Sequence, residues 1–248
     1  MIGNSVLAKE IKILKTLQHP RIVRLIDVFV TIDALQIVME FAEGVELFEE
    51  ISGPGKKFTE NDAKEVIRMV LEGVEYIHAQ GIIHRDLKPE NLIWLDDPST
   101  GKKTLKIIDF GFARFSNESA KESTSGTLGY KPPEVISPSL NIPQSTKSDM
   151  WSIGVISYIL LCGFPPFFSF SEDASDDWRL SSSPFWTLFN EKTDELVNSI
   201  TLGTYAFPPT FWDSVSENAK DFVRNLLKVS PEQRMSAEEA LKHPWMSN

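Results

Sequence analysis

The sequence predicts an α+β protein in which a small, strand-containing N-terminal part precedes a larger, mainly helical C-terminal part. Two observations support this prediction. Short runs of β-branched and aromatic residues recur in pairs within the first 110 residues, which is typical of antiparallel hairpins. Beyond residue 133, apolar residues recur at helical spacing instead. With 248 residues and 42% hydrophobic content, the chain is long enough to bury a sizeable core.

The first 41 residues predict one helix followed by one hairpin. Apolar residues from Val6 to Leu17 recur at roughly helical spacing with charged residues between them, and the His-Pro pair at 19–20 ends the pattern. The runs 22–30 and 35–41 are rich in β-branched and aromatic residues, and a four-residue connection separates them. We therefore expect these two runs to form an antiparallel hairpin.

The middle of the chain predicts two further helices and a second hairpin. Residues 47–51 and about 61–80 have helical patterns. The runs 91–95 and 105–108 flank the sequence Asp-Asp-Pro-Ser-Thr-Gly, whose residues are typical of turns. These two runs therefore predict a hairpin.

A mostly apolar stretch covers residues 150–168, but Gly154, Gly163 and two prolines interrupt it. A buried core helix that ends near Gly163 is therefore favoured over a membrane span. The Ser- and Asp-rich stretch 169–183 predicts a solvated surface insertion.

The residues that carry chemistry are concentrated in two short motifs. His-Arg-Asp-Leu-Lys-Pro-Glu-Asn occupies residues 84–91, and Asp-Phe-Gly at 109–111 follows an apolar strand. Phosphoryl transfer needs a base near the attacking hydroxyl, oxygen ligands for Mg²⁺, and positive charge near the phosphate oxygens. Asp86 supplies the base, Asn91 and Asp109 supply the oxygen ligands, and Lys88 supplies the positive charge.

With these motifs the chain resembles eukaryotic protein kinases. The resemblance implies ATP and Mg²⁺ as cofactors and a protein-kinase-like fold. It also implies that Asp86 orients or deprotonates the substrate hydroxyl and that Asn91 and Asp109 hold Mg²⁺. Arg85 would be available to pair with a phosphorylated activation segment.

The resemblance is to the serine/threonine type of kinase. Tyrosine kinases usually have alanine or arginine where Lys88 stands, and the hydroxyl of Thr127 is placed to bridge Asp86 and Lys88. Sequences at 46–50, 158–167 and 243–246 resemble the calcium/calmodulin-dependent kinase group most closely; they read Glu-Leu-Phe-Glu-Glu, Tyr-Ile-Leu-Leu-Cys-Gly-Phe-Pro-Pro-Phe and His-Pro-Trp-Met.

Further residues match the family's structural pattern. Glu134 in Lys-Pro-Pro-Glu resembles the glutamate of the family's Ala-Pro-Glu, and Arg234 is expected to pair with it. Asp149 matches the aspartate of the central buried helix that braces the catalytic loop. Glu10 matches the helix glutamate that pairs with a strand lysine. Four side chains whose stacking marks an active kinase are matched by Leu14, Leu25, His84 and Phe110.

The resemblance also implies a nucleotide site and a division of the chain 1–248. Residues 1–40 would be a truncated N-lobe, 41–46 a hinge, and 47–248 a complete, mainly helical C-lobe. Cofactor-binding residues are expected beyond the catalytic loop as well. They are Met39 as gatekeeper, Glu40 to Ala42 as adenine contacts, Glu46 as a ribose or substrate-arginine contact, and Lys88, Asn91 and Asp109.

The family's glycine-rich loop and its Val-Ala-Ile-Lys strand do not occur in the 248 residues, and nine residues precede Glu10. We therefore expect an N-lobe of one helix and a two-stranded hairpin, with a sheet edge open to a partner chain. Lys9 and Lys12 do not replace the strand lysine, because they lie on the same helix as Glu10. Two functions remain open: a serine/threonine kinase, or a catalytically weak or inactive pseudokinase that acts as an interaction module.

Composition limits the partners and the compartment. The formal charge is −10, from 25 basic and 35 acidic residues, which favours basic protein substrates and argues against nucleic acid and anionic membranes. The single Cys162 cannot form an internal disulfide. The start of the chain has neither a signal-peptide pattern nor a myristoylation glycine, so a cytoplasmic location is expected, with the nucleus as an alternative.

Hydroxyl and imidazole side chains complete the set of candidates. The hydroxyls of the activation segment are expected to be solvated or to be phosphorylated; before Thr127 they are Ser119, Ser123, Thr124 and Ser125. None of the histidines has metal-ligand spacing, so all are expected to be structural; they are His19, His78, His84 and His243.

Overall fold

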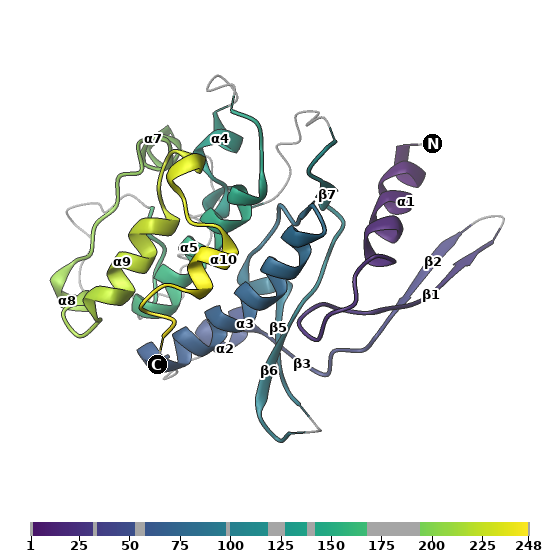
Figure 1. The fold of residues 1–248 in the computed structure, drawn as a ribbon, viewed down its shortest axis with the longest axis horizontal. Helices are drawn as coiled ribbons and strands as arrows, with labels where there is room; N and C mark the ends of the chain where they lie inside the picture. Colours follow the sequence, from purple (N-terminus) through teal and green to yellow (C-terminus); the bar gives the residue numbers. More distant parts are fainter. Residues whose placement is uncertain are drawn as a thin grey trace.

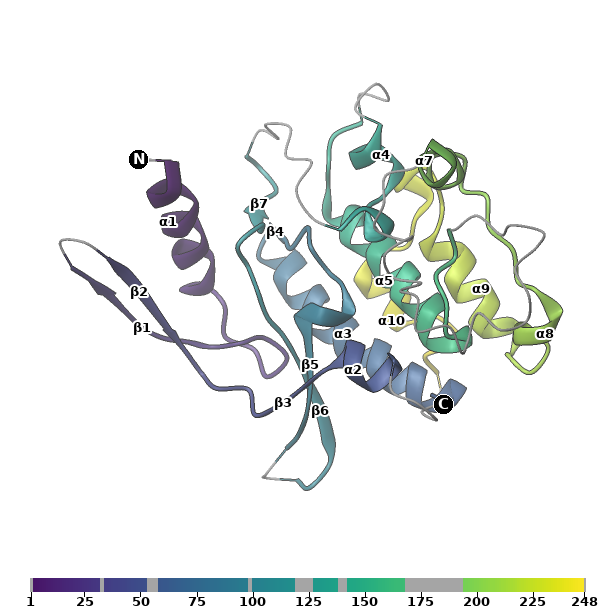
Figure 2. The same cartoon turned by 180° about the vertical axis from the view of Figure 1, so that it is seen from behind.

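The computed structural model has the predicted α+β fold, with a helical body at one end and a small N-terminal part at the other (Figures 1 and 2). It describes residues 2–31, 34–52, 58–97, 100–118, 127–137, 142–167 and 194–247. The candidate phosphorylation sites at 119–125 and the predicted surface insertion at 169–183 lie outside these ranges.

The first half of the chain contains both helices and strands, and within the described ranges the second half contains helices. In the first half they are α1 (Ile2–Leu14), β1 (Leu25–Val30), β2 (Leu35–Met39), β3 (Gly44–Glu46), α2 (Leu47–Ser52), α3 (Glu60–Ala79), β4 (Ile82–Ile83), η1 (Pro89–Asn91), β5 (Leu92–Asp96), β6 (Lys103–Ile107) and β7 (Arg114–Phe115). In the second half they are η2 (Leu128–Tyr130), α4 (Pro133–Ile136), α5 (Thr146–Cys162), α7 (Asp194–Leu202), α8 (Pro209–Trp212), α9 (Glu217–Leu226), η5 (Pro231–Gln233) and α10 (Ala237–Leu241).

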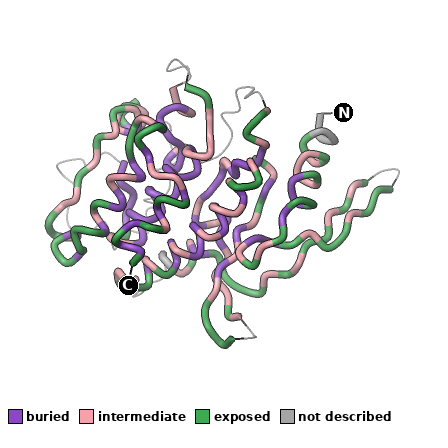
Figure 3. The backbone as a smooth tube through the Cα atoms, in the orientation of Figure 1, coloured by how far each residue is buried: buried purple, intermediate pink, exposed green. Residues whose placement is uncertain are grey.

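The N-terminal part consists of α1 and the β1–β2 hairpin, as predicted. The two strands are antiparallel, with Val28 opposite Ile37, and a bulge separates Leu25 from Asp27. Within the described residues these strands pair only with each other. Figure 3 shows the hairpin mainly in the colours of exposed and intermediate residues, whereas the helical body holds most of the buried ones.

The predicted strand 22–30 is wrong in its first residues. Ile22 forms a parallel bridge with Ile107 of β6, and the Val23 amide donates to the Ile107 carbonyl at 3.0 Å. Both isoleucines are buried. Burial beside β6 therefore decides where this segment pairs, and a local pattern of β-branched residues cannot show that partner.

The second predicted hairpin is present as β5 and β6, and a third strand extends it. β3 pairs antiparallel with β5, so part of the predicted hinge 41–46 is a strand. A Cβ on Gly44 would lie 2.4 Å from the carbonyl oxygen of Trp94. Glycine is therefore required for the close approach of these two strands.

The centre of the helical body is α5, which confirms the prediction of a buried helix ending near Gly163. Every residue from Ser148 to Leu160 is buried. Ser145 caps the N-terminus by accepting from the Lys147 amide, and Gly163 ends the helix with a φ of 91°. None of the helices in the described ranges combines the length and apolar content that crossing a membrane requires.

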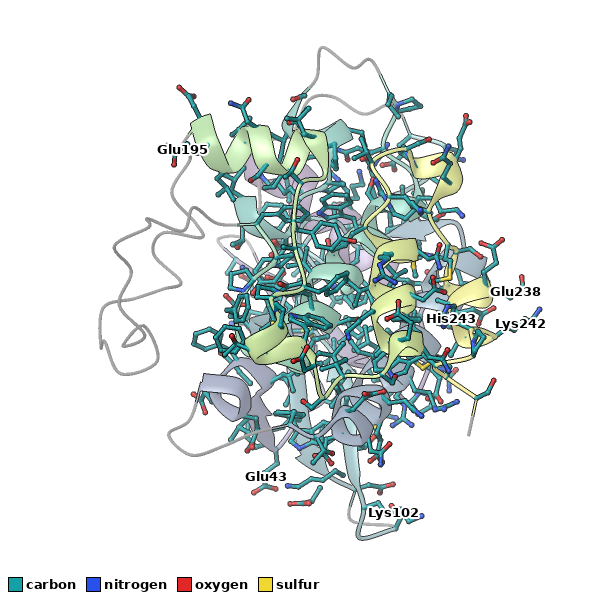
Figure 4. All side chains as sticks on the ribbon, turned by 90° about the vertical axis from the view of Figure 1, so that its left-hand side faces the viewer. Glu43, Lys102, Glu195, Glu238, Lys242 and His243 are labelled. Atoms are coloured by element: carbon teal, nitrogen blue, oxygen red, sulfur yellow. The ribbon has the colours of Figure 1, made fainter. Side chains whose placement is uncertain are left out.

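The last helices pack around α3 and α5. α10 contacts α3, and α9 contacts α5. In Figure 4, Glu238, Lys242 and His243 lie on this side of the molecule, and the Glu238–Lys242 ion pair is exposed. His243 is bonded to Asp221 at 3.0 Å, in agreement with a structural histidine.

A buried ion pair joins α4 to the segment before α10. Arg234 donates to both carboxylate oxygens of Glu134, at 3.0 and 3.1 Å, and the two side chains are at most 1% exposed. Arg234 also donates to the carbonyl of Lys147 at 2.6 Å. The pair expected from the sequence is therefore present, and it reaches the first turn of α5.

We predict that Arg234→Met lowers the free energy of unfolding by roughly 3–5 kcal/mol, because the carboxylate of Glu134 remains buried without its partner. Urea denaturation followed by circular dichroism measures this change. Lys242→Met is the matched control, since it removes an exposed ion pair, and it should leave stability unchanged within error. Equal stability of the two variants would contradict the prediction.

Candidate active site

A two-stranded sheet brings the two sequence motifs together. β4 ends directly before residues 84–91, and β7 begins just after the Asp-Phe-Gly motif. The strands pair antiparallel, with Ile82 opposite Phe115 and Ile83 opposite Arg114. Strands of two residues are too short to show a periodic pattern, so the sequence did not predict this sheet.

Asp86 and Asn91 form the centre of the site and are both 6% exposed. The Asn91 amide nitrogen donates to the Asp86 carbonyl at 2.8 Å and to its Oδ2 at 3.0 Å. These bonds fix the orientation of the carboxamide and turn Oδ1 of Asn91 away from Asp86. An amide oxygen held in this way suits a hard cation.

Lys88 lies between Asp86 and Thr127. Its ammonium nitrogen is 3.4 Å from Oδ2 of Asp86 and donates to the Thr127 hydroxyl at 3.2 Å. Sequence reasoning placed the threonine hydroxyl between the two charged groups, whereas the structure places the ammonium there. An ammonium has three donors and suits this central position.

Asp109 is tied to the same site through its backbone. The amide of Ile108 donates to the Asn91 carbonyl at 3.0 Å, and the Ile108 carbonyl accepts from His84 Nε2 at 3.0 Å. Asp109 itself has a φ of 59°, and its Oδ1 accepts from the Gly111 amide at 3.1 Å. A positive φ at a non-glycine residue is uncommon and is concentrated at functional positions.

The loop of residues 84–91 is held by the carboxylate of Asp149, which is 1% exposed. Its Oδ2 accepts from the His84 amide at 2.9 Å and lies 2.8 Å from His78 Nε2, while Oδ1 accepts from the Arg85 amide at 2.8 Å. Burial acts to raise the pKa of Asp149, but the bond from His78 and the neighbouring donors hold it below its usual value. The Arg85 backbone that it holds has a φ of 72°.

The four side chains expected to stack lie on or against one core. Phe110 and His84 are buried with ring centroids 4.9 Å apart. Leu14 is buried in the same core, and Leu25 is partly buried against it. The core thus connects α1 and β1 with the two motifs.

Glu10 lies near the Asp-Phe-Gly motif. Burial raises the pKa of Glu10, and the negative charge of Asp109 raises it further. Lys9 pairs with Glu118 instead, and the Lys12 ammonium lies 5.1 Å from the centroid of the Phe115 ring. Neither lysine therefore serves as the partner of Glu10. This agrees with the prediction that Lys9 and Lys12 do not replace the strand lysine.

The expected nucleotide contacts lie between the end of β2 and the end of β3 and face different surroundings. The Glu40 carboxylate binds Lys106 at 2.6 Å and accepts from the Arg24 amide at 2.9 Å. Met39 and Glu46 are exposed, and Ala42 is half-buried. In the described part of the chain, no hydrogen bond or ion pair joins these four residues to the side chains of Asp86, Asn91 or Asp109.

Two charged side chains near Asp86 were given no role by sequence reasoning. The pKa of Glu90 is raised above its usual value, chiefly by burial and also by the charges of Asp86 and Glu46, although the charge of Lys88 opposes this shift. Lys131 is 9% exposed, and burial lowers its pKa against the opposing charge of Asp86. The sequence signal for Lys131 was its position directly before Pro-Pro-Glu.

The arrangement joins a carboxylate, an ammonium and an oriented carboxamide, with a second carboxylate on an adjoining loop. Asp86, Lys88, Asn91 and Thr127 are in direct contact, and Asp109 is joined to them through Ile108. This donor set provides a proton acceptor, oxygen ligands for a divalent cation and a positive charge beside both. Its chemistry fits a nucleotide bound with Mg²⁺.

Comparison with known proteins agrees with this chemistry. The family described as "Protein kinase domain" matches residues 2–246. Calcium/calmodulin-dependent protein kinase type 1 from Macrobrachium nipponense is 39% identical over 241 residues, which cover 97% of this chain and 62% of the relative. The Caenorhabditis elegans protein of the same name is also 39% identical, with the same coverage.

A fungal relative is similar to a comparable degree. Calcium/calmodulin-dependent protein kinase cmkA from Emericella nidulans is 41% identical over 239 residues, covering 96% of this chain and 51% of the relative. The chain therefore spans between half and two thirds of the length of these relatives. Since the family match covers nearly every residue, the chain belongs to the protein kinase domain family.

Proposed function

We propose that the chain is the catalytic part of a protein serine/threonine kinase, which transfers the γ-phosphoryl group of ATP to serine or threonine hydroxyls. The observation that carries this proposal is the contact of Asp86 with both Lys88 and Asn91, together with the bond from the Ile108 amide to the Asn91 carbonyl directly before Asp109. The contact of Lys88 with Thr127 supports the serine/threonine type of kinase, because a lysine and a threonine at these two positions fit the pattern of that type.

Each residue has a defined role in this proposal. The Asp86 carboxylate orients the substrate hydroxyl and accepts its proton, and Lys88 places positive charge where phosphate oxygens gather. Oδ1 of Asn91 and the carboxylate of Asp109 would hold Mg²⁺, which when bound neutralises charge on the phosphate oxygens. Met39 would be the gatekeeper, Glu40 to Ala42 would contact adenine, and Glu46 would contact the ribose or a substrate arginine.

The proposed substrates are basic segments of proteins. The net charge of −10 favours cationic partners, and the carboxylates of Glu46 and Glu90 lie close enough for the charge of Glu46 to raise the pKa of Glu90. A cation of the substrate would relieve this repulsion.

A second candidate function is an interaction module with little or no catalysis. One observation favours it: the β1–β2 hairpin exposes large apolar side chains and has no further strand within the described residues. These side chains are Ile26, Phe29, Val30, Val38, Met39 and the adjoining Phe41. In this alternative an extended segment of a partner chain adds a strand to the hairpin and covers them.

We predict that Asp109→Asn lowers phosphate transfer to a basic peptide by at least about 100-fold, because it removes a metal ligand's charge. Radiolabelled ATP at fixed Mg²⁺ measures the transfer. Asp213→Asn changes an exposed aspartate and serves as the control that retains activity. Equal signals from the wild-type chain and Asp109→Asn would mean that the transfer comes from a contaminant, which would refute the kinase proposal.

We also predict that residues 1–248 alone bind Mg-ATP weakly and transfer phosphate slowly. The 248 residues contain no glycine-rich loop or Val-Ala-Ile-Lys lysine, and one preorganised donor to a transition state is worth roughly 100- to 1,000-fold in rate. Fusion of a strand-forming segment with both motifs before residue 1 should raise kcat/KM by at least this factor. A turnover of residues 1–248 that the fusion does not increase would contradict this prediction.

A further inference from the structure

Gln144 bonds two arginines that come from the two halves of the site. Its side-chain Oε1 accepts from Arg85 Nε at 2.9 Å, and its backbone carbonyl accepts from Arg114 at 2.8 Å. Arg85 directly precedes Asp86, and Arg114 stands three residues after Gly111. One residue outside both motifs therefore contacts the loop of Asp86 and the strand that follows Asp109.

The two guanidinium groups are held close together in a largely buried setting. Arg114 is 4% exposed, and Arg85 is half-buried. Burial lowers the pKa of Arg85, and the charge of Arg114 lowers it further, although both groups stay protonated at neutral pH. Like charges in such a setting repel each other, so acceptors must hold them.

The acceptors of these bonds are uncharged. Besides the two oxygens of Gln144, Arg85 donates to the Phe112 carbonyl at 3.3 Å, and Arg114 donates to the Glu118 carbonyl at 2.5 Å. A carbonyl satisfies a guanidinium N–H without adding another buried charge. Among these acceptors, the Oε1 atom of Gln144 is the one that a side-chain substitution removes.

Gln144 also connects the arginines to the framework of the protein. It directly precedes Ser145, the N-cap of α5, and α5 carries Asp149. Asp149 holds the backbone of Arg85, whose φ is 72°, while Gln144 holds its side chain. A strained backbone persists only where its surroundings over-determine it, and these two contacts restrain Arg85 at both ends.

We propose that Gln144 is a positioning residue for phosphoryl transfer: by bonding Arg85 and Arg114 together, it fixes the loop of Asp86 relative to the segment of Asp109. The inference rests on the proposed kinase function and adds a residue that neither motif contains. In this proposal Gln144 acts on the rate through its bond to Arg85 and not through a bond to the substrate or the metal.

The test compares Gln144→Met with Gln144→Glu in residues 1–248. Methionine keeps the length of the side chain and removes the acceptor, whereas glutamate keeps the acceptor and adds charge. We expect Gln144→Met to lower kcat about tenfold, as loss of a bond to a charged group implies. KM for ATP and peptide should stay unchanged, and Gln144→Glu should retain the wild-type kcat.

A control and a stability measurement separate positioning from a merely structural role. Gln233→Met changes an exposed glutamine of η5 in the same way and should retain the wild-type kcat. Thermal unfolding should show that Gln144→Met and Gln144→Glu both stay folded at the assay temperature, so that a lower kcat of Gln144→Met does not reflect unfolding. An unchanged kcat in Gln144→Met, or an equal loss of kcat in both variants, would overturn the proposal.

A second readout does not depend on catalysis. In protein labelled with ¹⁵N-arginine, the Nε–H signal of Arg85 should exchange slowly with water in the wild type and in Gln144→Glu, and rapidly in Gln144→Met. If the wild-type chain transfers no more phosphate than Asp109→Asn, the kinase proposal fails, but this exchange still tests the contact. Slow exchange in Gln144→Met would refute the positioning role.

Discussion

The geometry of the candidate site depends on one buried carboxylate. Asp149 accepts the backbone amides of His84 and Arg85 and is bonded to His78. A buried charge is tolerated when hydrogen bonds replace its hydration, and here the replacement comes from the loop that the carboxylate holds. Loss of this carboxylate would leave two loop amides without their acceptor and would release the positive φ of Arg85.

The helix that carries Asp149 is fastened to the rest of the fold at the same end. Ser148 donates to the Glu134 carboxylate at 3.0 Å, and Arg234 bonds both Glu134 and the Lys147 carbonyl. The first turn of α5 is therefore connected to the Pro-Pro-Glu segment, the C-terminal region and the loop of residues 84–91. Functional loops need such a rigid scaffold, because their own backbones have few partners.

Local patterns predicted the elements that are long or strongly periodic. The helix 61–80 is present as α3, and the buried helix ends at the glycine that its sequence indicated. The same reasoning failed at Ile22, which pairs with Ile107, and it did not predict the strand β3 at residues 44–46. These segments have the composition of strands or loops, but their partners lie more than 40 residues away.

By itself, the sequence determined which chemical groups are present and in what order, because the two motifs are contiguous and their residue types suit phosphoryl transfer. Only the tertiary structure decided how these groups face each other. The bond between Arg85 and Gln144 spans 59 residues, and the buried pair of Glu134 and Arg234 spans 100. Contacts over such separations depend on the packing of whole helices and strands, and no local spacing of residues encodes that packing.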